Sequence, residues 1–508
     1  MIARVAAIAR ADAAIRLRRW STVVTFLLLS ACAYLWVPDP STGRALIQIE
    51  GRRALYNSAA LGMATAMLAT LFVGLFGFYV ISNAVRRDID SRCGLLLAST
   101  PMRKSEYIAG KFAGNVAFLA LFTSGFMVTS MAMQIVRGEA PLHPITFVLQ
   151  YALLAPPAIV FVAATAVIFE CTPFLSSRFG DVLYFFFWAG TLGSVAASLE
   201  HGASSVLVKA FDFTGMGFAL DVMKRTVHTT SMSIGSSRFD VHQPPFVFQG
   251  LVLPPEWIAP RVLSLIMPIV AMAFVTLWFH RFDPARVRRA AGGFVRSRLS
   301  RVARALSAAG RPLSRMLMRL PSGGVASTDA LLTFSLTPWP ILVWIGVTIA
   351  AIVNPRSLPV ALAATAVMVA DVASRDRRAG TLALIRSAPH LRERFVGWKF
   401  ASATIVAFAF MAVPIVRSPS PIAAAVATLF IALTATAAGV ATNNPKTFIV
   451  LFLTFWYVVV NDRGTPALNF GGVHGAPAAS VTAAYAAIAV AVAIAGQLLY
   501  GQRLRRGD

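Results

Sequence analysis

The sequence is poor in charged residues. Only 13% of its 508 residues are Asp, Glu, Lys or Arg, whereas a typical soluble domain has roughly 25%. Hydrophobic residues make up 57%, and the mean hydropathy is +0.69. So little charge excludes a chain that is mostly a water-soluble domain. It predicts an all-α polytopic membrane protein, because a helix needs about 20 apolar residues to cross a hydrocarbon core of about 30 Å.

Cysteine and histidine are also scarce. The three cysteines, Cys32, Cys93 and Cys171, are odd in number and have no Cys-x-x-Cys spacing. The seven histidines are scattered along the chain without the spacing of metal ligands. This pattern excludes a disulfide framework and gives no support to a metal site. We therefore expect neither a metal nor any other cofactor.

Motifs that would supply energy or catalysis are missing. No Gly-x-x-x-x-Gly-Lys-Ser/Thr motif occurs, and Gly110-Lys111 is followed by Phe112. The apolar segments carry no carboxylate near their middle, although proton- and sodium-driven carriers usually need one as a relay. Lys111, Asp371 and Lys399 lie near segment ends, where charged groups can reach the interface. We expect no enzymatic activity and no catalytic residues in this chain.

Apolar segments bounded by charge, proline or glycine give twelve predicted spans in two sets of six. These are 20–37, 57–82, 108–135, 145–169, 182–199 and 258–279, then 338–353, 358–373, 396–416, 419–441, 447–460 and 480–500. The expected organisation is a first half at 1–282, an arginine-rich cytoplasmic linker at 283–336, and a second half at 337–508. The first nineteen residues carry five arginines and no signal-peptide core, which favours an interfacial helix.

The net charge of +25 follows the predicted spans. With the N-terminus in the cytoplasm, 34 of the 46 Lys and Arg residues fall in cytoplasmic segments, as the positive-inside rule expects. We interpret the basic residues as topological and expect no nucleic-acid partner. Arginine outnumbers lysine 40 to 6, a composition typical of GC-rich bacterial genomes. The expected location is the bacterial inner membrane, multi-pass in the lipid bilayer, with both termini cytoplasmic.

The loops that follow the second span of each half resemble one another. Asp-Ser-Arg-Cys-Gly at 90–94 matches Asp-Arg-Arg-Ala-Gly at 376–380 with an offset of 286. Pro101 and the Lys-Phe-Ala at 111–113 match Pro389 and 399–401 with an offset of 288, so we infer a two-residue insertion. Because equivalent loops lie six spans apart, the halves share one orientation. This predicts two parallel six-helix repeats. A weaker similarity is that an aspartate, Asp12 or Asp329, precedes the first span of each half.

The repeated loops suit short amphipathic helices at the membrane surface. Leucines at 95–97 precede Pro101, which ends a helix because the residue before proline is pushed out of the helical region. Two such elements on one face could dock two copies of a soluble partner by helix-in-groove contacts. The simpler interpretation is a loop that only anchors topology through its arginines. The duplication favours docking.

These loops carry a family resemblance. Arg-x-Gly at 92–94, a leucine-rich stretch, Ser-Thr-Pro at 99–101 and Tyr-x-x-Gly-Lys at 107–111 resemble the coupling region of type-2 ABC (ATP-binding cassette) permeases. His-Arg-Phe-Asp-Pro at 280–284 is also similar to that group. The second loop departs from the pattern at Ala388, Phe395 and Trp398.

The resemblance implies a permease subunit, an exporter of an unidentified substrate, with two halves fused in one chain. The resemblance also implies that separate cytoplasmic ATPase subunits energise it, with two copies docking on the two loops. The residues expected to couple the loops to the ATPase are Arg92, Gly94, Pro101, Tyr107, Gly110 and Lys111, with Arg378, Gly380, Pro389, Phe395, Gly397 and Lys399.

Two other functions remain open at this point. A secondary carrier of the major facilitator type also has six plus six spans, and residues 375–380 faintly resemble its inner loop. A membrane enzyme acting on lipid-linked substrates would need an acidic cluster. Asp39 in the short first outer loop is a candidate for it, but no second acidic cluster supports this interpretation. The long outer loop at 200–257 includes residues 211–227, which either cap an exit path or lie on the membrane, or else belong to a solvated loop.

Overall fold

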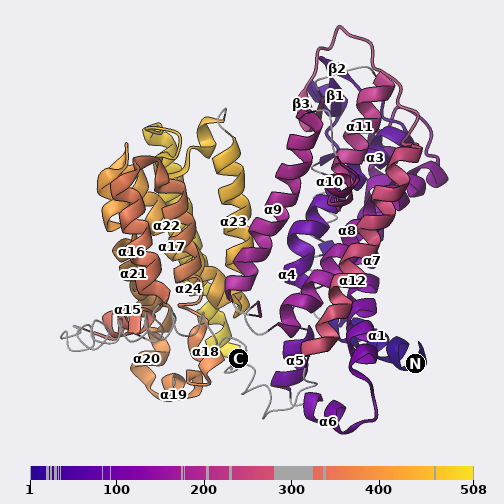
Figure 1. Ribbon diagram of the computed structural model, residues 1–508. Coiled ribbons are helices and arrows are strands. Elements are labelled where there is room, and N and C mark those ends of the chain that lie inside the picture. Colours follow the sequence, from indigo (N-terminus) through magenta and orange to yellow (C-terminus); the bar gives the residue numbers. More distant parts are fainter. Residues whose placement is uncertain are drawn as a thin grey trace. The chain divides into compact units, whose positions relative to one another are not determined.

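The computed structural model describes residues 2–18, 22, 26–27, 31, 34, 36–82, 84–91, 93–172, 175–176, 178–201, 205–227, 232–279, 324–335, 339–462 and 465–506. The chain divides into two compact units, Met1–Ala290 (unit 1) and Ala291–Asp508 (unit 2), shown in Figure 1. Most of the first predicted span, Arg92, the motif at 280–284 and most of the predicted linker lie outside the described residues.

Unit 1 is built from long helices that begin where the sequence supplies a helix start. Asn57 caps α3 by accepting a hydrogen bond from the Ala60 amide at 2.8 Å. Pro144 and Pro255 open α8 and α12 at a position where a missing N–H costs nothing. The long elements are α1 (Ile2–Leu17), α3 (Ser58–Phe72), a π-helical turn η2 (Val73–Gly77), α4 (Phe78–Ile81), α7 (Lys104–Arg137), α8 (Pro144–Cys171), α9 (Arg178–His201) and α12 (Pro255–Trp278).

Unit 2 is also built from helices. It contains α15 (Val325–Ser335), α16 (Trp339–Val353), α17 (Leu358–Val369), α21 (Phe395–Arg417), α22 (Pro421–Thr442), α23 (Pro445–Asn461) and α24 (Ala479–Arg506). Among the described residues of the whole chain, seven helices are long and apolar enough to cross a membrane. They are the helices over predicted spans two, three, four, six, nine, ten and twelve, whereas α16, α17 and α23 are shorter.

A small antiparallel sheet departs from the all-helical expectation. Its strands β1 (Arg44–Ile49), β2 (Arg52–Arg53) and β3 (Met232–Arg238) are ordered β2-β1-β3. Glu50 and Gly51 link the first two strands with φ of 50° and 85°, the backbone that a two-residue hairpin turn requires. The third strand comes from the long loop at 200–257. The sheet therefore joins two loops that are far apart in the sequence.

The rest of that long loop is folded onto the helices. Its helix α11 (Met216–Val227) lies toward the same end of unit 1 as the sheet (Figure 1), and α10 (Val206–Ala210) packs on α12. Phe218, Ala219 and Met223 of α11 are fully buried in a core that includes α3 and α8. A solvated loop would leave these side chains exposed, so that alternative is wrong. We call residues 38–56 and 205–254 the cap.

A buried arginine ties α12 to the cap and to α8. Pro157 lies inside α8 and has no N–H to give to the carbonyl of Leu153, four residues earlier. Arg261 of α12 donates to that carbonyl, to the carbonyl of Leu154 at 3.2 Å and to that of Asp212 in the cap at 3.0 Å. In an apolar environment every backbone polar group needs such a partner. Arg261 therefore compensates for the proline in α8.

Candidate functional site: two buried ion clusters beneath matching loops

The two repeated loops each fold into short helices. The first loop, residues 82–103, holds α5 (Ala84–Asp90) and α6 (Cys93–Ser99) between α4 and α7. The second loop, residues 370–394, holds α18 (Arg375–Ala379), α19 (Leu382–Ser387) and α20 (Pro389–Glu393) between α17 and α21. Within each unit the loop lies at one end of the long helices (Figure 1).

A buried ion cluster lies under the first loop. Lys111 of α7 is 3% exposed, and its Nζ lies 3.1 Å from Asp12 Oδ1 and 2.8 Å from Asp88 Oδ2. Asp12 of α1 also pairs with Arg16 at 2.7 Å and with Arg87 of α5. We call these five residues the first ion cluster. It fastens the N-terminal helix and the start of the loop to the beginning of α7.

Unit 2 has a cluster of the same kind. Lys399 of α21 is fully buried, and its Nζ lies 3.1 Å from Asp329 Oδ1 and 2.6 Å from Asp376 Oδ2. Arg375 lies 2.6 Å from Asp329, and Ser402 donates a hydrogen bond to the same carboxylate at 2.6 Å. Asp329, Arg375, Asp376 and Lys399 form the second ion cluster, which joins α15, the second loop and α21.

The two clusters correct the register predicted from the sequence. Positions 288 apart make the same contacts: Arg87 and Arg375, Asp88 and Asp376, Lys111 and Lys399. Between the start of each loop and the long helix that follows it, α7 or α21, one offset of 288 therefore relates the equivalent residues, and the inferred two-residue insertion is wrong there. Asp12 and Asp329, which lie before the loops, are 317 positions apart. The glycines matched in that alignment differ accordingly. Gly94 is buried inside α6, whereas Gly380 is exposed and ends α18 with a φ of 74°.

Beside each ion cluster, an aromatic stack connects the long helix after the loop, α7 or α21, to the last long helix of the unit or to the residue that follows that helix. Tyr107 stacks on Phe279 with ring centroids 5.7 Å apart, and Phe395 stacks on Tyr500 at 5.4 Å. The hydroxyl is on opposite partners in the two units. Tyr107 donates to Asp88 at 2.8 Å, and Tyr500 donates to the carbonyl of Arg392 in the second loop at 3.0 Å. Either way, the phenol ties the stack to the loop.

The same side of each short helix faces inward. Leu97 packs on the core around Tyr107, and Ile385, 288 residues later, packs on the core around Phe395. The residue before each points away: Leu96 is 71% exposed and Leu384 is 73% exposed. Ser99 and Ser387 donate to the carbonyls of these leucines at 2.8 and 2.7 Å. Both loops thus present a leucine to the outside at this position, and the first loop also exposes Ile89 at 47%.

The clusters differ in their balance of charge. The first holds three cations against two carboxylates, and the second holds two against two. The extra cation is Arg16, four residues after Asp12. Its counterpart, four residues after Asp329, is Thr333, which accepts a hydrogen bond from Arg375 at 2.8 Å. Arg16 is accommodated by a 2.7 Å hydrogen bond to Asn115 and by the nearby negative charge of Glu170.

Asp12 is held ionised by its neighbours. Burial is the largest influence and raises the pKa of its carboxyl, but the charges of Arg16, Lys111 and Arg87 together outweigh burial. The net result is a pKa below the ordinary value. A buried carboxylate with three cations around it is the arrangement in which a charged group tolerates low dielectric.

The predicted coupling residues occupy three kinds of position. Tyr107, Lys111, Phe395 and Lys399 are buried in the clusters and stacks. Pro101, Pro389, Gly380 and Gly397 are exposed, and Gly94 and Gly110 are buried. A Cβ on Gly110 would lie 2.7 Å from Ile8 Cβ, whereas a Cβ on Gly397 would meet nothing within 4 Å. Arg92 and the side chain of Arg378 lie outside the described residues.

The sequence analysis missed the counter-ions. It expected Lys111 and Lys399 to extend toward the membrane interface, but both are buried and paired. Asp12 and Asp329 were noted only as an echo between the halves. A lysine in an apolar segment requires a partner of opposite charge. This requirement, together with the recurrence of an aspartate before the first span of each half, could have identified Asp12 and Asp329 as the partners.

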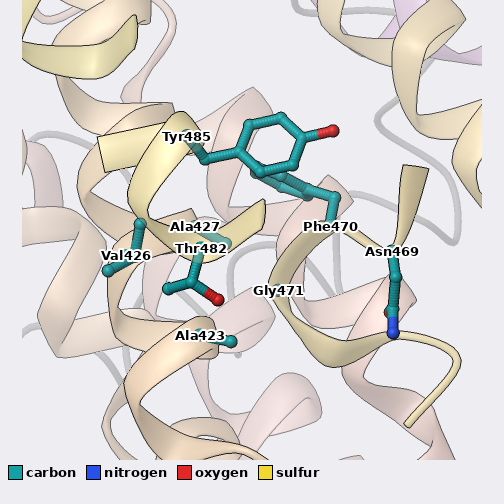
Figure 2. A pocket seen from close by; sticks show the side chains of 8 residues that line it. All are labelled: Ala423, Val426, Ala427, Asn469, Phe470, Gly471, Thr482 and Tyr485. Carbon is teal, nitrogen blue, oxygen red and sulfur yellow. The ribbon is translucent and has the colours of Figure 1, made fainter. Parts of the chain in front are cut away.

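The described residues offer little else that could bind a ligand. They contain no group of three or more His, Cys, Asp or Glu side chains placed to hold a metal ion. A small hollow in unit 2, between α22 and α24, is lined by Asn469, Phe470 and Tyr485 (Figure 2). The rings of Phe470 and Tyr485 lie 5.0 Å apart, and the hollow has no space for a water molecule. We assign it a packing role.

Comparison with known proteins gave no match: no family model, no curated protein and no solved structure is similar to this chain. The candidate site therefore stands on the sequence and the geometry alone. Its central feature is the pair of ion clusters, each holding a loop with one outward-facing leucine.

Proposed function

We propose that this chain is the membrane-spanning permease subunit of an ABC-type transporter, an exporter driven by separate ATPase subunits. In this proposal the ATPase subunits dock on the first and second loops from the cytoplasm. Both chain termini lie on that side of a bacterial inner membrane. The chain supplies the substrate path and no nucleotide site of its own.

The observation that carries the proposal is the exposed leucine at the same place in both loops. Leu96 and Leu384 stand on short helices whose opposite sides, at Leu97 and Ile385, are anchored in the cores. A single exposed leucine is normal on a protein surface, so the support comes from its recurrence at the equivalent position of both loops, on short helices of the kind that dock into grooves. Two such contacts, one in each unit, suit two soluble subunits.

The similarity of the two units also bears on the architecture of the membrane-spanning part. We infer twelve spans arranged as two parallel six-helix repeats. In the loop region, equivalent residues of the two repeats are 288 positions apart. The matching ion clusters, the matching stacks and the matching serine hydrogen bonds support this inference. Residues without a contact role at the surface, such as Lys111 and Lys399, would then serve as positioning residues that keep each loop rigid.

The ion clusters give the loops the stiffness that coupling needs. A force applied at Leu96 or Leu384 moves the third long helix of the unit only if the loop does not bend first. Removing one partner of a buried ion pair leaves an uncompensated charge and costs about 3–5 kcal/mol. The ends of each loop that join the long helices are therefore resistant to local distortion.

The test is co-purification from native membranes in mild detergent, followed by ATPase activity of the eluate. We expect an ATPase at about two copies per chain, and its loss when Leu96→Ser and Leu384→Ser are combined. Val241→Ser, at a 74% exposed position in the cap, is the matched control and should retain the partner. If the chain purifies without an ATPase and a proton gradient drives its transport, the proposal is wrong and the carrier alternative holds.

A further inference from the structure

The two loops differ sharply in charge at equivalent positions. Residues 89–106 contain three basic and two acidic side chains, a net charge of +1. The equivalent residues 377–394 contain five basic and one acidic, a net charge of +4. Around the exposed leucines the first loop is thus nearly neutral, whereas the second is strongly basic.

The additional cations of the second loop are free to meet a partner. Arg377, Arg392 and Arg394 are exposed and Arg386 is half-buried. None of these four forms an ion pair with the described residues of the chain. In the first loop, by contrast, Glu106 accepts a hydrogen bond from the Arg103 amide and pairs with Arg4 of α1 at 3.4 Å. The first loop thus holds one of its two acidic side chains in an ion pair with α1, whereas the second loop has only Glu393 against five arginines.

Topology does not account for this difference. Basic residues in a cytoplasmic loop fix the orientation of neighbouring spans, and the first loop, in the equivalent position, does so with a net charge of +1. Ala98 and Met102 occupy the places of Arg386 and His390. The second loop therefore has an arginine, Arg386, on the same short helix as Leu384 where the first loop has an alanine.

We propose that the two loops receive unlike surfaces, and that the second loop binds an ATPase subunit whose docking groove is acidic. The inference rests on the proposed function and adds the chemistry of the partner. Leu384 fills the apolar part of the groove, while Arg386, Arg392 and Arg394 face carboxylates at its rim. The surface received by the first loop is apolar and nearly neutral around Leu96. The ATPase pair is then two different chains, or one chain whose two copies bind with unequal strength.

Charge complementarity of this kind controls partner choice and the salt dependence of binding more than total affinity. Exposed charges interact over a Debye length of about 10 Å at 0.1 M salt and about 3 Å at 1 M. Contact at the second loop should therefore weaken steeply as salt rises, whereas contact at the first loop should change little.

The experiment compares two matched double variants of the full chain in purified complexes. Arg392→Glu with Arg394→Glu reverses two charges in the second loop. Arg103→Glu with Lys104→Glu reverses two charges in the first loop. We expect the second-loop variant to weaken binding of one ATPase subunit about tenfold or more at 0.1 M salt, and to leave the other bound. The first-loop variant should weaken binding by less than about threefold. Acid-to-lysine changes in the groove of the partner should restore binding to the second-loop variant.

Three outcomes overturn the inference. The first is equal loss of both subunits with either variant, and the second is equal retention with unchanged salt dependence. The third is a second-loop variant that keeps both subunits but loses binding to vesicles containing anionic lipid, which would assign the basic residues to lipid headgroups. Absence of any ATPase from the wild-type complex would instead contradict the proposed function itself.

Discussion

At the scale of single residues, the most informative positions are buried charges. Lys399 has no exposed surface, and its amine lies within ion-pair distance of two carboxylates. Such a group is tolerated only while its partners remain, because an isolated charge in a low dielectric is strongly unfavourable. The four members of the second ion cluster should therefore behave as a unit.

Breaking that unit should be non-additive. Lys399→Met alone leaves two carboxylates facing one arginine, and Asp329→Asn alone leaves two cations facing one carboxylate. We expect each single variant to destabilise the folded protein by about 3–5 kcal/mol. The double variant leaves one cation, Arg375, and one carboxylate, Asp376, so the cluster stays neutral and its loss should be smaller than the sum.

Thermal unfolding in detergent measures these losses, with Arg377→Met at an exposed position as the control. A double variant whose loss equals the sum of the two single losses would show that the cluster does not act as a unit.

The first cluster gives a pH dependence with a definite sign. The cations around Asp12 hold the pKa of its carboxyl below the ordinary value despite burial, which for an aspartate is about 3.9. Its contribution to stability is therefore fully present above about pH 4 and is lost as the pH falls through the lower folded pKa. The stability gap between wild type and Asp12→Asn should be constant from pH 7 down to about pH 5. It should narrow below pH 4. A gap that widens in acid would contradict this account.

At the scale of elements, the N-terminal helix and α7 approach closely because of one glycine. A Cβ at Gly110 would lie 2.7 Å from Ile8 Cβ, a distance that real side chains do not reach. Gly397, which the sequence analysis also expected to be a coupling residue, lies in α21 with open space around it. Although both glycines were predicted to have the same role, close helix packing requires a glycine at position 110 and does not require one at position 397.

These glycines make a matched pair for mutation. Gly110→Ala should separate α1 from α7 and lower stability by about 1–3 kcal/mol, the usual cost of overpacking. Gly397→Ala should be neutral or stabilise by about 0.5–1 kcal/mol, since alanine favours the helix. Unfolding in detergent compares both with the wild type. Equal effects at the two sites would mean that the packing of α1 on α7 does not depend on Gly110.

At the scale of the whole molecule, the chain consists of two units that share a design and differ in detail. Each has a surface helix bearing an aspartate, a loop with an outward leucine, and a last helix fixed by an aromatic stack. Unit 1 adds a cap with a small sheet, and unit 2 adds positive charge on its loop. Shared features belong to the mechanism that we propose for both units. The differences are where the two loops could have separate tasks.

Sequence reasoning succeeded where the signal was local. Long apolar runs predicted α7, α8, α12, α21, α22 and α24, because helix length and hydropathy are properties of a continuous segment. The motif around 107–113 and 395–401 marked the loops for the same reason. Local patterns also misled: matching Asp-x-Arg-x-Gly strings suggested an insertion, whereas the contacts of Asp88 and Asp376 require none.

By itself, the sequence determined that this chain is helical and apolar, that it carries related loops, and that it lacks a nucleotide-binding motif. Only the tertiary structure decided which carboxylates neutralise Lys111 and Lys399, that β1 pairs with β3 across nearly 190 residues, and which leucine of each loop faces outward. The reason is physical. Spans follow from the solvation of a continuous segment, whereas ion pairs, strand pairing and exposure depend on distant segments that meet only in the folded chain.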